Sequence, residues 1–108
     1  MEKKMARYGV LMTTTATRED AQNIARALLD AKLAACVQLM PIESCYMWQD
    51  ALQNEAEILL LVKTRAALFK DAMAAIKEVH PYETPEIVAL DFAAGAPGYF
   101  AWIDSVTK

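Results

Sequence analysis

The chain of 108 residues has few of the residue types that build metal centres and crosslinks, with two cysteines and one histidine. No C-x-x-C or H-x-x-x-H spacing occurs, which argues against a ready-made structural zinc site within one chain. If Cys36 and Cys45 lie on one extended segment, they are about 30 Å apart, too far for a disulfide. We therefore expect neither a disulfide framework nor a zinc module.

Other absences narrow the class of protein further. With three glycines, the chain has neither a Walker loop nor a G-x-G-x-x-G motif. No apolar run approaches the roughly 18 residues of a membrane span. The basic start Met1–Arg7 is followed by an interruption at Thr13–Thr17, so we expect no signal peptide and a cytoplasmic location. A net charge of -3 argues against nucleic acid or an anionic membrane as the main partner.

Apolar residues, in contrast, are abundant. They make up 56% of the chain, against an average near about 45–50%. At this length residues 1–108 form one domain, and a monomer of this size has modest stability unless partners add to it. The excess of apolar side chains therefore needs a burial site other than lipid.

Hydrophobic periodicity predicts an alternation of strands and helices. The predicted strands are Tyr8–Thr14, Ala34–Trp48, Glu55–Lys63 and Glu86–Phe92, with a polar hairpin break at Gln49–Glu55. The predicted helices begin at Thr17, which can cap the first one, at about Ala66 and at Tyr99. The order β-α-β-β-α-β with an extra C-terminal helix is that of the α+β, ferredoxin-like sandwich with an antiparallel sheet.

The third predicted strand carries apolar side chains on both of its faces. Ile58, Leu60 and Val62 form one face, while Leu59 and Leu61 make the other face half apolar. In a ferredoxin-like sandwich the helices cover only one face of the sheet. We therefore predict that another subunit covers the second face.

The segment His80–Glu86, with the sequence HPYETPE, holds the only histidine and two of the four prolines. Its prolines stiffen a polar connector between a helix and a strand, and such connectors often carry sites. His80 could act as a general base, as a metal ligand or as a cation at the helix end. The plainer interpretation is a helix stop followed by the entry into an edge strand.

A second candidate region lies on the two central strands. Tyr46 and Trp48 project from one side of the long strand, and Glu57 and Lys63 come from its neighbour. These side chains could line a ligand cleft. The alternative is a packed interface with a surface ion pair.

Four segments together give the chain a family resemblance. They are Leu33–Val37 (LAACV), Ser44–Trp48 (SCYMW), Glu57–Thr64 (EILLLVKT) and His80–Glu86 (HPYETPE). In this order and spacing the chain resembles the CutA divalent-cation tolerance proteins over roughly Val10 to Trp102.

The resemblance implies a tight homotrimer, similar to the PII signalling proteins, with clefts between subunits and no established catalytic activity. It also implies binding of copper or another divalent cation and a role in metal tolerance, with no protein partner identified. The implied metal ligands are Cys36, His80 and Glu57. The implied ligand-cleft residues are Tyr46, Trp48, Lys63, Tyr82 and Glu86.

Two positions depart from the family pattern. Asp50 stands where the family usually has a glycine after Trp48, and Gln38 stands where it usually has an asparagine. Three other functions stay open: a PII-like sensor of small molecules, a purely structural trimer, and an enzyme using His80 with Glu83 or Glu86 as an acid–base pair.

Overall fold

The computed structural model describes residues 7–108. The basic segment Met1–Arg7, which was considered as the start of a signal peptide, therefore lies largely outside the described residues. The strands are β1 (Tyr8–Thr15), β2 (Cys36–Trp48), β3 (Ala51–Arg65) and β4 (Ile87–Asp91). The helices are α1 (Arg18–Asp30), the short 3-10 turn η1 (Ala66–Leu68), α2 (Phe69–Val79) and α3 (Pro97–Val106). None of the helices in the described part of the chain has both the length and the apolar character needed to cross a bilayer.

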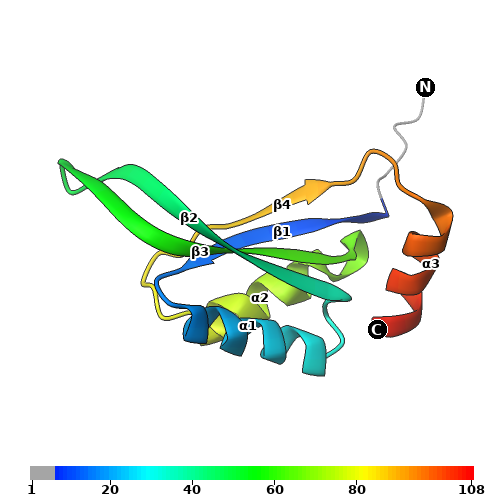
Figure 1. The fold of residues 1–108 in the computed structure, drawn as a ribbon. Coiled ribbons are helices and arrows are strands. Elements are labelled where there is room, and N and C mark those ends of the chain that lie inside the picture. The colour runs from blue at the N-terminus through cyan, green and yellow to red at the C-terminus, as the bar shows by residue number, and fades with distance from the viewer. Residues whose placement is uncertain (1–6) are drawn as a thin grey trace.

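The four strands form one antiparallel sheet in the order β2-β3-β1-β4. Helices α1 and α2 lie side by side against one face of this sheet, while α3 lies at one end (Figure 1). This is the predicted α+β, ferredoxin-like arrangement, which the structure confirms.

Local sequence explains the start and the packing of α1. Thr17 is the N-cap, and its side chain accepts a hydrogen bond of 3.1 Å from the backbone N–H of Asp20, as the capping pattern predicts. Ala21, Ile24 and Leu28 recur at helical spacing and are fully buried against the sheet. The apolar stripe therefore places the helix on the sheet.

Two separate hydrophobic cores stabilise the described part of the chain. The main one lies between the sheet and α1 and α2, and includes Leu11, Leu60 and Ile76, all fully buried. The smaller one lies on the other face, where α3 packs Ile103 against Tyr8. Residues 7–108 thus cover only one end of that second face.

Strands β2 and β3 extend beyond the other two strands of the sheet. They pair along their whole length, from Cys36 opposite Lys63 to Trp48 opposite Ala51. Strand β1 pairs only with residues 58–65 of β3, so the remainder of the hairpin projects as a two-stranded arm (Figure 1). We call residues 42–57 the arm.

The hairpin predicted within Gln49–Glu55 is present, but the break between the strands is shorter than predicted. The turn consists only of Gln49 and Asp50, and β3 begins at Ala51. Both turn residues have positive φ, 50° and 63°, as a tight two-residue hairpin turn requires. A glycine at position 50 is therefore not needed to form the turn, although the left-handed conformation is strained for residues with a side chain.

The sheet face opposite α1 and α2 remains largely exposed. Its apolar side chains include Met40, Val88 and Leu90, each about half exposed. At the arm, Met47 and Leu52 are 63% and 74% exposed. The prediction of apolar side chains on both faces is confirmed, and we call the uncovered one the open face.

Candidate functional site

His80 occupies the C-cap of α2 and is buried. Its Nε2 lies 2.8 Å from the carbonyl oxygen of Thr14, and its Nδ1 lies 3.1 Å from the backbone nitrogen of Tyr82. Because a carbonyl only accepts and an N–H only donates, the ring is neutral with its proton on Nε2. Both ring nitrogens are therefore engaged in fixing the segment His80–Glu86 to β1.

Tyr82 extends this connection to β3. Its hydroxyl donates a hydrogen bond of 2.8 Å to Oε2 of Glu57, which is 8% exposed. The ring of Tyr82 also lies 4.8 Å from that of His80. A carboxylate this deeply buried normally has a cationic partner, whereas the partner of Glu57 is a neutral phenol.

Tyr46 and Glu55 also lie near Glu57, and the two carboxylates raise the pKa of both Tyr46 and Tyr82. Burial, and then the hydrogen bond to Glu57, raise the pKa of Tyr82 above its ordinary value of 10.0. Partial burial, and then the nearby Glu55 carboxylate, raise the pKa of Tyr46. Both phenols thus stay protonated at neutral pH beside two carboxylates. We call Tyr46, Glu55, Glu57 and Tyr82 the acidic cluster.

The predicted ligand Cys36 lies far from this cluster. It is a free, half-buried cysteine opposite Lys63 on β3, six residues from Glu57, or about 20 Å along the strand. The Lys63 ammonium lies 5.7 Å from the centre of the Tyr99 ring on α3. Cys36 and Lys63 therefore belong to the α3 end of the open face, and the acidic cluster belongs to the arm end.

The predicted metal ligands are therefore separated within a single chain, and whether they meet across subunits stays a prediction. Cys36, His80 and Glu57 do not converge, and residues 7–108 contain no group of three or more His, Cys, Asp or Glu side chains arranged to hold an ion. The predicted cleft is also divided: Tyr46 and Tyr82 lie together, Trp48 is half exposed on the arm, and Glu86 is exposed before β4. Which of these residues bind a ligand stays a prediction.

The hydrogen bond between Tyr82 and Glu57 could not be found from the sequence, because it joins residues 25 positions apart. The available signal was the position of Tyr82 between two prolines, which fixes the direction of the chain. The burial of Glu57 could not be predicted from the sequence either, because charged and apolar residues alternate around it as in a half-exposed strand.

Comparisons with known proteins agree on the family. Residues 9–106 match the family model described as CutA1 divalent ion tolerance protein. The chain is 42% identical over 95 residues to the divalent-cation tolerance protein CutA of Thermus thermophilus, covering 87% of this chain and 92% of the relative. It is 39% identical over 89 residues to protein CutA of Mus musculus, covering 82% of this chain but only 50% of that protein.

The fold comparison gives the same result. The CutA1 crystal structure from Ehrlichia chaffeensis superposes with a TM-score of 0.91 at 35% identity, covering 97% of this chain and 99% of that one. Fold and sequence thus agree over almost the whole chain.

Proposed function

The chain belongs to the CutA1 divalent ion tolerance family, and from that premise we propose that it forms a homotrimer that binds divalent cations, copper in particular, in the response to metal ions. The observation that carries the proposal is the buried Glu57 carboxylate, whose hydrogen bond comes from the phenol of Tyr82 and not from a cation. A buried negative charge of this kind favours the binding of a positive ion.

The oxygen atoms of the acidic cluster suit such an ion only in part. Glu57 and Glu55 offer carboxylate oxygens, which bind divalent metals, and Tyr82 holds Glu57 in place. A complete ligand set is not formed within residues 7–108 of one chain. The missing ligands would come from a second copy, and Cys36 is the softest donor at the other end of the open face.

Assembly is supported by what the subunit leaves uncovered. The arm is only two strands wide, and an isolated two-stranded hairpin is at best marginally stable in water. Its exposed apolar side chains, with Val88 and Leu90 on β4, form a surface typical of a subunit interface. Three copies would cover three open faces around one axis.

We propose that the protein binds its ligand and does not catalyse a reaction. We also propose that it acts in the cytoplasm, where its two free cysteines stay reduced. The acid–base alternative requires a histidine nitrogen that is free to exchange a proton. Both nitrogens of His80 are engaged, by Thr14 and by Tyr82.

Two measurements test the proposal. Light scattering on the purified protein should give about three times the chain mass of 12.0 kDa. Calorimetric titration with Cu(II), and with Cu(I) under anaerobic conditions, should give saturable binding that Glu57→Gln weakens by about tenfold or more. Glu78→Gln, an exposed carboxylate on α2, is the matched control and should bind as the wild type does.

The variants Cys36→Ala and His80→Ala complete the titration series. Weaker binding in Cys36→Ala would assign the thiol to the site, while a loss in His80→Ala alone would indicate that the ring positions Tyr82. A single chain in solution, or full copper affinity in all three variants, would contradict the proposal. A trimer without copper affinity would favour the purely structural function.

A further inference from the structure

The segment His80–Glu86 crosses the end of β1 at the base of the arm. Strand β1 pairs only with residues 58–65 of β3, so Glu57 is the first residue of β3 beyond that pairing. The segment contacts both strands, through His80 to β1 and through Tyr82 to Glu57. Figure 1 shows it as the yellow loop beside the point where the arm leaves the sheet. The segment therefore joins the sheet to the arm.

Tyr82 holds the middle of this segment with two hydrogen bonds, which we call the latch. Its backbone N–H donates to Nδ1 of His80 over 3.1 Å, and its hydroxyl donates to Oε2 of Glu57 over 2.8 Å. An imidazole nitrogen and a carboxylate oxygen are both common ligands of divalent cations. The latch therefore occupies a donor atom on each of two predicted metal ligands with a single residue.

Tyr82 is also the most exposed member of this contact. Glu57 and His80 are each 8% exposed, whereas Tyr82 is only half-buried. The ring of Tyr82 lies 4.8 Å from the ring of His80. A cation that approaches Glu57 from solution therefore meets the phenol first, and it competes with the hydroxyl for the same carboxylate oxygen.

Few other contacts hold the segment in place. Within the described part of the chain, residues 81–84 take part in no backbone–backbone hydrogen bond. Pro81 and Pro85 have no N–H to donate, and their rings restrict the backbone between them. At its two ends the segment is attached by the bond of His80 to β1 and by β4, which begins at Ile87. Loss of the latch therefore frees the middle of the segment while both ends stay attached.

We propose that the latch couples cation binding to a movement of this segment: when a divalent cation binds Glu57, the Tyr82 hydroxyl leaves Oε2 and residues 81–86 move away from the sheet. This inference rests on the proposed function, since it takes Glu57 as a ligand, and it adds a change of surface that accompanies binding. Because a hydrogen bond to a carboxylate must be broken first, the latch lowers the affinity for the cation by about tenfold or more. Tyr82 is thus a regulatory residue and not a ligand.

Hydrogen exchange measured by mass spectrometry on the full-length protein tests the movement. The amide of Tyr82 reports on it directly, because that amide is hydrogen-bonded to His80 in the latch. Saturating Cu(II) should speed exchange at this amide by about fivefold or more. Glu57→Gln keeps an acceptor for the phenol but loses the charge, so its exchange should not respond to Cu(II).

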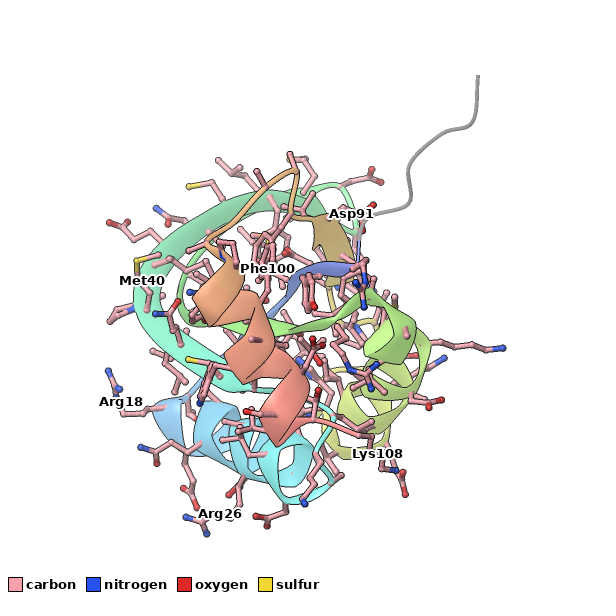
Figure 2. The ribbon with its side chains drawn as sticks, turned by 90° about the vertical axis from the view of Figure 1, so that its right-hand side faces the viewer. Arg18, Arg26, Met40, Asp91, Phe100 and Lys108 are labelled. Atoms are coloured by element: carbon pink, nitrogen blue, oxygen red, sulfur yellow. The ribbon has the colours of Figure 1, made fainter. Side chains whose placement is uncertain are left out.

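Tyr82→Phe removes the hydroxyl and so weakens the latch without a cation. In calorimetric titration this variant should bind Cu(II) about tenfold more tightly than the wild type, and its amide at position 82 should exchange faster before Cu(II) is added. Tyr99→Phe is the matched control, because it makes the same change on α3, which lies at the end of the molecule away from the arm and faces the viewer in Figure 2. It should keep the wild-type affinity and exchange. Thermal melts check that each variant keeps the fold.

Equal or weaker Cu(II) binding in Tyr82→Phe overturns the inference, because a phenol that only positions Glu57 for the cation gives that result. Saturable Cu(II) binding to the wild type with unchanged exchange at Tyr82 overturns it as well, and leaves the proposed function intact. Absence of Cu(II) binding in the wild type and in Tyr82→Phe alike contradicts the proposed function, and the inference with it.

Discussion

Replacing Tyr82 by phenylalanine tests the connection on which the candidate site depends. The substitution keeps the ring beside His80 and removes only the hydroxyl that donates 2.8 Å to Glu57. A hydrogen bond to a charged group contributes about 1.5–3 kcal/mol, and a partly exposed pair lies toward the middle of that range, about 2 kcal/mol. For a chain of this length we expect the melting temperature to fall by about 8 °C.

A double-mutant cycle with Glu57→Gln separates this bond from general damage. Glutamine still accepts the phenol hydrogen bond but carries no charge, so Tyr82→Phe should cost only about 1 kcal/mol in that background. Urea unfolding at one fixed protein concentration gives the four free energies. An equal cost of Tyr82→Phe in both backgrounds would refute the view that a buried, charged Glu57 depends on this phenol.

Three further predictions follow from individual residues. Asp50→Gly should raise the free energy of unfolding by about 1 kcal/mol, because glycine adopts the φ of 63° without strain; thermal melts beside Asp50→Ala, which keeps the strain, will measure it. Thr13→Val should stabilise by about 1 kcal/mol in urea unfolding, since the buried Thr13 hydroxyl has no hydrogen-bond partner among the described residues, and a loss of stability would contradict this. Because the pKa of Tyr82 is raised in the fold, the contribution of Tyr82 to the free energy of unfolding should be fully present below its ordinary pKa of 10.0. That contribution should be lost as the pH rises further, so the free energy of unfolding should fall less in Tyr82→Phe than in the wild type.

The sequence predicted the layers of the fold because their signals are local. Short apolar runs located β1 and β4, and Thr17 marked the start of α1 with its own hydrogen bond. The polar run Gln49–Glu55 led to a predicted break that is too long, because polar residues usually end strands. In this chain the run continues β3 along the arm, where both faces of a two-stranded ribbon meet water or a partner.

The site was harder to predict because its contacts join distant parts of the chain. The residue types of the segment His80–Glu86 drew attention to it, but only the fold shows that the carbonyl of Thr14 occupies one nitrogen of His80. In the same way, only the register of β2 and β3 shows that Cys36 and Glu57 lie far apart within one chain.

The arm also exposes the chain to aggregation during folding. A ribbon with two unpaired backbone edges can recruit any extended peptide, which is a common route to aggregation. Here Pro41, just before the arm, removes one amide donor from the outer edge of β2, and Glu43 and Glu55 place negative charge along both strands. We expect that replacing these three residues with β-formers would keep the fold but promote aggregation in the cell.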